Sequence, residues 1–267
     1  MYNWKKKLKL VLLFSMMLLL GCNPNSKNKQ KAENTNASIA AKGTDSLSVQ
    51  FSTYDINKKY YNKAGSYLEL ILKLPKLKGN YTGIPKINSF FATKDTFFLN
   101  QLDLNDFRKE NYNYPGGDSH WFRSADYKLE AVYDDVISMS AILDGGMGGV
   151  SWDGIEGDVF NLTTGKKLEL SDLFKVSQKE YMPIIFDFVK KSIMKNNFDF
   201  NYGDPYSGDG LKAVKAWQTD CFYLTNNTLV IFYEKYALAC GAEGVIKFEI
   251  PLKQVSNILK IHIKRNS

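Results

Sequence analysis

The stretch from Tyr127 to Leu143, YKLEAVYDDVISMSAIL, decides the fold class of this 267-residue chain. Apolar residues alternate with polar neighbours in each half of it, and Asp134 and Asp135 lie between the halves. A period of two is typical of a strand with one buried face, and paired aspartates favour a turn. We therefore predict an antiparallel hairpin. The alternating apolar positions are Tyr127, Leu129, Ala131 and Tyr133, then Ile137, Met139, Ala141 and Leu143.

The region before this hairpin predicts a strand and then helical structure. Periodic structure begins near Ser66, where Tyr67 to Leu74 alternate, and we expect Pro75 to end that strand. From Ile84 to about Phe107 the apolar residues recur at helical spacing. This spacing predicts one long helix or two shorter ones packed against a sheet.

After the hairpin, residues 158–162 read as a short strand, residues 163–166 (TTGK) as a turn, and Leu168 and Leu170 as a continuation of the sheet. Ser177 and Glu180 have the spacing of a capping box that opens an amphipathic helix.

Pro183 lies too deep for the first turn of that helix, so we place the start of the helix near Met182. Its predicted buried face comprises Tyr181, Ile184, Ile185, Phe188 and Ile193.

The C-terminal part predicts more antiparallel sheet. Residues 222–225 and 228–236 pair through Asn226-Asn227, residue types that tolerate the positive φ of a type I′ turn. Residues 246–250 alternate as the last strand, and Pro251 starts a short helix. The predicted class is α+β, a mainly antiparallel sheet with helices packed on one face.

The first 22 residues have the pattern of a bacterial lipoprotein signal. Four lysines precede an apolar run from Leu10 to Leu20, which is shorter than the ~20 residues that span a membrane. Gly21 before Cys22 resembles a lipobox, although Leu20 is bulkier than the usual residue there. We expect residues 1–21 to be cleaved and Cys22 to carry a diacylglyceryl and palmitate anchor. An uncleaved anchor or a plain secretory signal is the alternative.

Residues 22–45 are expected to form a disordered tether, because they are polar and offer little to bury. The chain has 35 basic and 28 acidic residues, but four of the lysines lie in the leader, so from Cys22 onward 31 basic residues face 28 acidic ones. Without a clustered basic face, nucleic acid is not an expected partner. The 44% apolar and 24% charged composition excludes coiled coils, collagen-like rods and polytopic membrane proteins.

Residues that could perform chemistry do not converge in the sequence. The two histidines, His120 and His262, read as a loop residue and a solvent-facing residue near the C-terminus, and no HExxH, CxxC or GxSxG motif occurs. We therefore expect no enzyme, cofactor or metal site. Two alternatives involve the acids that flank the glycine cluster 145–149: calcium binding, or a glycan hydrolase that uses paired carboxylates. These acids are Asp144, Asp153, Glu156 and Asp158.

Aromatic loop residues are the candidates for ligand contact. Trp152, Tyr202, Tyr206 and Tyr236 lie in or near predicted loops, where exposed aromatic rings suit a protein interface or stacking on sugars. Cys221 and Cys240 are candidates for a disulfide outside the cytoplasm. The two-residue turn, however, places Cys221 opposite Phe232 rather than Cys240.

The runs NLTTGKKLELSDLF (161–174) and FYLTNNTLVIFYEKYALACGAEGVIKFEIPL (222–252) resemble the RsiV-type extracellular domain family. That domain is the outer part of lysozyme-sensing anti-sigma factors, and a related copy precedes some peptidoglycan deacetylase domains. The resemblance covers about residues 47–253, with an N-terminal subregion at 46–150 and a C-terminal subregion at 151–267. It departs at Gly145-Gly146-Met147-Gly148-Gly149, where relatives often have Gly-Gly-Ala-His-Gly.

The resemblance implies a non-catalytic domain that binds an envelope macromolecule. A lysozyme-type muramidase or peptidoglycan is the expected partner, at the extracytoplasmic face of a bacterial membrane. Because only the short leader precedes the fold and no deacetylase domain follows residue 253, we expect neither an anti-sigma role nor deacetylase activity.

Overall fold

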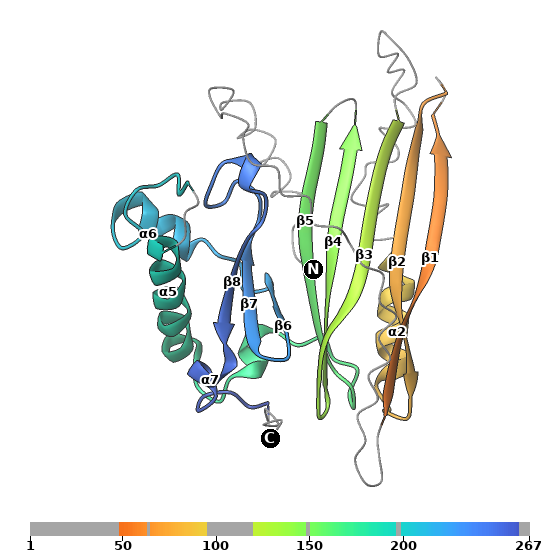
Figure 1. Cartoon of the computed structure of the whole chain (residues 1–267). Helices are drawn as coiled ribbons and strands as arrows, with labels where there is room; N and C mark the ends of the chain where they lie inside the picture. Colours follow the sequence, from red (N-terminus) through yellow and green to blue (C-terminus); the bar gives the residue numbers. More distant parts are fainter. Residues whose placement is uncertain (1–47, 63–64, 95–119, 148–149, 196–198, 262–267) are drawn as a thin grey trace. The chain divides into compact units, whose positions relative to one another are not determined.

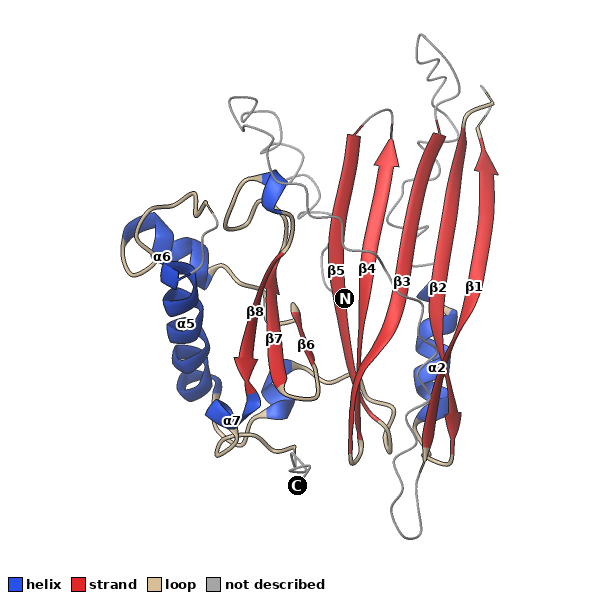
Figure 2. Ribbon diagram, viewed as in Figure 1, coloured by secondary structure: helices blue, strands red, loops and turns tan. Residues whose placement is uncertain are grey.

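The computed structural model describes residues 48–62, 65–94, 120–147, 150–195 and 199–261, and of residues 147 and 150–152 it describes the backbone. Within these ranges, eight strands form a five-stranded sheet in the order β1-β2-β3-β4-β5 and a three-stranded sheet in the order β6-β7-β8 (Figures 1 and 2). All pairs are antiparallel except β2 with β3. The α+β prediction is confirmed, with two sheets in place of one. The strands are β1 Val49–Tyr61, β2 Tyr67–Gly79, β3 His120–Tyr133, β4 Val136–Met147, β5 Val150–Asn161, β6 Phe222–Leu224, β7 Thr228–Tyr233 and β8 Ile246–Pro251.

Each sheet carries a helix. Helix α2 (Ile84–Ala92) packs on one side of the five-stranded sheet, where Ile87 and Phe91 are fully buried among leucines of β2. Helix α5 (Gln178–Lys195) lies against the three-stranded sheet, so the layers run α2, large sheet, small sheet, α5 (Figure 1). The remaining helices are short: α6 Gly208–Lys215, α7 Leu252–Val255, and the 3-10 turns η1 Leu170–Leu173 and η2 Gly241–Glu243.

The predicted hairpin of β3 and β4 is present, but its alternation is interrupted. The register between the strands shifts at Leu129 and Ala131. Tyr127 therefore packs on the side of α2, whereas Ala131 and Tyr133 pack on the opposite side, beneath the small sheet. A bulge adds one residue and turns the following side chains to the other face. The sequence pattern did not reveal this change of face.

Strand β1 was missed by the sequence analysis, and β2 is longer than predicted. β2 runs through Pro75 to Gly79 and pairs with β1 along its whole length, but with β3 only as far as Lys73. Beyond that point the Asn88 side chain of α2 bonds both the amide (2.8 Å) and the carbonyl (2.9 Å) of Leu77. Pro75 lies two residues earlier on the strand, so its backbone nitrogen points to the same side as that of Leu77, away from β1. Its missing N–H therefore costs no bond between β1 and β2.

The region after the hairpin differs from the prediction in extent. β5 begins at Val150, not near Asp158, and Gly145 and Gly146 lie inside β4. Gly165 of the predicted turn takes φ +65°. Beyond this turn the sheet is continued only by a bridge between Phe160 and Lys167, and Leu170 begins the 3-10 turn η1.

Helix α5 starts at Gln178, earlier than predicted, and Pro183 lies inside it. The Ser177–Glu180 cap is present, because the amide of Ser177 donates to the Glu180 carboxylate at 2.9 Å. Pro183 is exposed, so the carbonyl that it leaves unpaired, that of Lys179, can bond water. Ile184 is exposed rather than buried, and the buried face is Tyr181, Ile185, Val189 and Ile193.

The predicted hairpin of β6 and β7 is confirmed, but residues 225–227 connect the strands and they do not form a type I′ turn. Neither Asn226 nor Asn227 has a positive φ. Instead the Thr225 hydroxyl accepts hydrogen bonds from the backbone amides of Asn227 (3.3 Å) and Thr228 (3.0 Å), as threonine side chains do in tight turns. As predicted, Cys221 lies opposite Phe232, whose amide donates to the Cys221 carbonyl at 3.0 Å. The short helix after Pro251 is confirmed as α7.

The two sheets approach each other closely between β5 and β6. The amide of Leu224 donates to the Ser138 hydroxyl of β4 at 2.8 Å. A Cβ atom added at Gly157 would lie 1.9 Å from the Phe222 carbonyl oxygen, whereas one added at Gly154 would be in ordinary contact with Leu143 at 3.7 Å. Only a glycine at position 157 permits this approach.

Gly157→Ala is therefore expected to destabilise the fold by about 1–3 kcal/mol, because the methyl group would push β6 away from β5. Gly154→Ala, on the same strand, is the matched control and should be neutral or slightly stabilising. Urea unfolding of the two variants measures the difference. Equal stabilities would show that the sheets do not pack at Gly157.

Candidate functional site

The five-stranded sheet has one face that is only partly covered. On the side away from α2, the small sheet covers the β4–β5 end near Ser138 and Gly157. The rest of that side, here called the open face, carries exposed apolar side chains: Tyr61 is 63% exposed, Ile71 42% and Ile142 59%. Exposed apolar groups that share one surface are typical of an interaction site.

A row of aromatic rings crosses the open face over β1, β2 and β3. Strand pairing puts Tyr61 opposite Tyr67 and Tyr67 opposite His120, and Phe122 follows on β3. The ring centroids are 5.8, 4.5 and 6.0 Å apart in that order, with interplanar angles of 30–42°. We call these four residues the aromatic ladder. His120, predicted to lie in a loop, is thus the first residue of β3.

Ionisable side chains pair at the ladder and, six residues farther along β2, at Lys73. Lys59 Nζ lies 4.9 Å from the centre of the Tyr67 ring and 3.7 Å from Glu69. His120 Nε2 lies 3.3 Å from the same glutamate, and Lys73 lies 3.5 Å from Asp126. Tyr67 therefore has Lys59 and His120 as close ring neighbours, so the ladder does not present that ring as a free platform for a sugar. An apolar centre within a charged rim matches the composition of protein interfaces.

The loop that carries Tyr236 adjoins the open face. Lys235 pairs with Asp153 of β5, which lies directly opposite Asp144 on this side of the sheet. Tyr236 is 63% exposed, and among the described residues it is the one non-glycine with a positive φ, +70°. Such a conformation is rare for a bulky residue and is found preferentially at functional sites. The structure thus places one of the predicted ligand residues on a loop that is tied to the β5 edge of the open face.

The other predicted ligand residues lie elsewhere. Tyr202 is on a segment joined to the Tyr236 loop by a bridge between Phe200 and Ala239. Tyr206 packs under Lys190 of α5, whose Nζ lies 4.9 Å from its ring centre. The described part of the structure does not include the side chain of Trp152, His262, or residues 1–47, which contain Cys22 and the tether.

The two cysteines that were candidates for a disulfide do not form one in the structure. Cys221 is buried in the core of the small sheet, and Cys240 is half-buried just before η2.

The acids that suggested calcium or glycosidase chemistry do not converge. Asp144 and Asp153 point to the open face, whereas Glu156 and Asp158 point to the opposite side, toward α2. Across the described ranges, no group of three His, Cys, Asp or Glu side chains is arranged to hold a metal ion. In the same ranges no helix combines the length and apolar character needed to cross a bilayer.

Glu156 and Asp158 instead belong to a buried ionic cluster. Asp158 is fully buried, pairs with Lys167, and lies 3.7 Å from the ammonium group of buried Lys94, which pairs with Glu156. The Tyr127 hydroxyl lies within hydrogen-bonding distance of both carboxylates, 2.8 Å from Glu156 and 3.0 Å from Asp158. The cluster joins the end of α2, β3, β5 and the turn after β5.

The charges of the cluster balance one another. Burial by itself would raise the pKa of Asp158, but Lys94 and Lys167 hold that pKa below its ordinary value. The pKa of Lys167 is raised, because the attraction of Asp158 and Glu156 outweighs burial. Burial and the two carboxylates raise the pKa of Tyr127 well above its ordinary value, so its hydroxyl stays protonated. Two cations facing two anions form a closed structural element rather than a ligand site.

Comparison with known proteins finds a family model that matches the C-terminal part and solved structures that are similar in fold to most of the chain. Residues 171–253 match the model of DUF3298, a protein family of unknown function, and no curated protein matches the chain. A DUF3298 family protein from Bacteroides fragilis NCTC 9343 is similar with a TM-score of 0.56 and 12% identity, over 80% of this chain and 94% of that one. One from Pseudomonas aeruginosa PAO1 gives 0.50 and 14%, over 81% and 95%. At these identities the likeness establishes the fold alone.

Asp158→Asn is expected to destabilise the protein by about 3–5 kcal/mol, because it leaves buried Lys94 and partly buried Lys167 without their counter-charge. Asp126→Asn removes an exposed carboxylate from its pair with Lys73 and should cost less than about 1 kcal/mol. Urea unfolding at neutral pH compares the two.

The same carboxylate predicts a pH dependence. Because the folded pKa of Asp158 is lowered, its contribution is complete above the ordinary aspartate pKa of about 3.9 and is lost as the pH falls toward the folded pKa. The wild type should therefore lose more stability between neutral pH and pH ~3 than Asp158→Asn does. An equal loss in both would mean that Asp158 is not ion-paired in solution.

Proposed function

We propose that this protein is a lipid-anchored, extracytoplasmic binding protein without catalytic activity, and that its open face binds a protein of the cell envelope. The observation that carries the proposal is the cluster of exposed apolar and aromatic side chains on a rigid sheet, bordered by paired charges. Aromatic anchors held on strands bind with little loss of side-chain entropy.

The chemistry of the open face favours a protein over a glycan. Ile71 and Ile142 offer aliphatic surface, and the close ring neighbours of Tyr67 are Lys59 and His120. A glycan would need a flat ring face, whereas a protein can insert its own apolar side chains between Ile71, Ile142 and Phe122. The resemblance of residues 161–174 and 222–252 to the RsiV-type domain makes a lysozyme-type muramidase the first partner to test. Peptidoglycan is the second.

The division of the four acids between two faces argues against the rival proposal of a glycan hydrolase. Asp144 and Asp153 lie on the open face, but Asp153 is paired with Lys235, and Glu156 and Asp158 are held in the buried cluster. A general acid and its partner carboxylate must flank one bond of the substrate.

Calorimetric titration of the chain from residue 23 onward with hen-type lysozyme tests the proposal. We expect micromolar or tighter binding, and Ile142→Ser should raise Kd about tenfold, because an apolar anchor at an interface is worth more than about 1 kcal/mol. Ile184→Ser is the matched control, since Ile184 is an equally simple exposed isoleucine on α5.

Equal Kd values for the two variants would show that the open face is not the binding site. Binding of soluble muropeptides but not of lysozyme would replace the protein partner with the cell wall. If neither binds to the wild type, the proposed class of partner is wrong.

Lipid anchoring is tested separately, in bacteria that express the full chain. The wild type should label with palmitate and sediment with membranes. Cys22→Ala should lose the label and keep its uncleaved leader, because lipidation of the thiol precedes cleavage. Palmitate labelling of Cys22→Ala would place the lipid elsewhere.

A further inference from the structure

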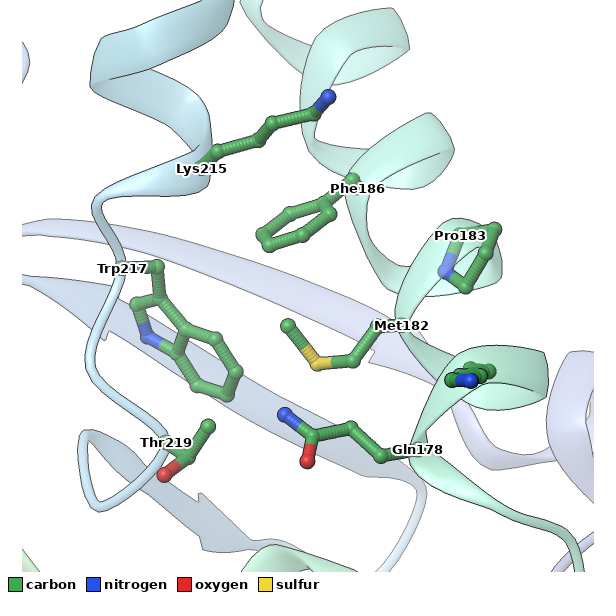
Figure 3. A pocket seen from close by; sticks show the side chains of 8 residues that line it. Gln178, Met182, Pro183, Phe186, Lys215, Trp217 and Thr219 are labelled. Atoms are coloured by element: carbon green, nitrogen blue, oxygen red, sulfur yellow. The ribbon is translucent and has the colours of Figure 1, made fainter.

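A second surface, separate from the open face, lies between α5 and the segment that follows α6. A groove of about 570 Å³ is lined there by Gln178, Lys179, Met182, Pro183, Phe186, Lys215, Trp217 and Thr219. In Figure 3, Met182, Phe186 and Trp217 turn toward one another in the groove. This volume is within the range of sites that bind small ligands or short peptides.

The floor of the groove is apolar and fixed in place. Trp217 is 7% exposed, and its ring nitrogen donates to the Phe232 carbonyl at 3.0 Å, which holds the indole in one orientation. Met182 and Phe186 pack partly into the core beside it. Methionine adapts its shape to the group that it contacts, so this floor can accept one large apolar side chain.

The rim of the groove is cationic. Its charged residues are Lys179 and Lys215, and none of its lining residues is acidic. Within the described ranges no carboxylate lies within ion-pair distance of either lysine. Lys215 lies beside Phe186 at one end of the groove (Figure 3), and Lys179, from the first turn of α5, also lines it. Two positive charges from two different helices therefore border the apolar floor.

We propose that this groove binds an acidic segment of a protein partner, in which carboxylates flank one large apolar side chain. The groove follows α5 from residue 178 to residue 186, about 12 Å at 1.5 Å per residue. That length accommodates about four residues of extended chain. The acidic stem peptides of the cell wall match the charge, but their side chains at the apolar positions are methyl groups, which would leave the floor of Met182, Phe186 and Trp217 largely unfilled.

The test is calorimetric titration of the chain from residue 23 onward with the peptide acetyl-EDLED-amide, compared with acetyl-EDAED-amide and acetyl-KKLKK-amide. We expect submillimolar binding of the first peptide, at least fivefold weaker binding of the second, and none of the third. Affinity should fall as salt rises from 50 to 300 mM, since the charges are exposed and screened.

Variants assign the binding to the groove. Lys179→Gln and Lys215→Gln should each raise Kd for acetyl-EDLED-amide at least threefold, whereas Lys253→Gln, an exposed lysine on α7, should leave it unchanged. These are surface substitutions, so folding is not at risk. Equal binding by all variants, or equal binding of the Leu and Ala peptides, would overturn the proposal. Preference for muropeptides over acetyl-EDLED-amide would also overturn it, in favour of the wall.

The proposal for the groove and the proposal for the open face can be refuted independently. Lys179→Gln and Lys215→Gln should not alter binding at the open face, and Ile142→Ser should not alter binding of acetyl-EDLED-amide. Loss of both bindings in a single variant would instead indicate one continuous interface.

Discussion

A fully buried carboxylate, that of Asp158, is the group on which the arrangement of the large sheet depends. Burying an unpaired carboxylate would cost more free energy than a fold can offset. Lys94 from the end of α2 and Lys167 from the turn after β5 must therefore both lie beside it. Tyr127 adds a hydroxyl from β3. One charge therefore fixes a helix end, two strands and a turn. Exchanging such a cluster for apolar residues can stabilise a protein, but removing a single partner cannot.

The opposite side of β5 is under a different constraint. At Gly157 the backbone of β6 comes so close that no side chain fits, and the Ser138 hydroxyl of β4 accepts the Leu224 amide. At this end of the large sheet β5 thus has both faces occupied, one by the ionic cluster and the other by the small sheet. Because the small sheet covers only that end, the ladder over β1, β2 and β3 is left exposed.

The fold therefore presents two surfaces of different chemistry. The open face is aromatic and aliphatic, with paired charges at its border, and it is built on strands. The groove beside α5 combines an apolar floor with lysines that have no acidic partner in the described structure. A binding protein with both could contact one partner protein at two places, or two different partners. Neither surface places a nucleophile or an acid–base pair around a shared cavity.

Local patterns in the sequence determined the α+β class, the β3–β4 and β6–β7 hairpins, the cap of α5 and the helix after Pro251, because each depends on neighbours in the chain. The sequence also pointed to Tyr236 as exposed. It did not reveal β1, the bulge beyond Leu129, the separation of Asp153 from Asp158, or the ladder. The ladder arises when β2 pairs with β3 between residues that are 53 positions apart in the chain, and the bulge turns Ala131 and Tyr133 toward the small sheet that docks at Gly157. Such contacts depend on which faces meet in space, and a one-dimensional pattern does not encode that choice.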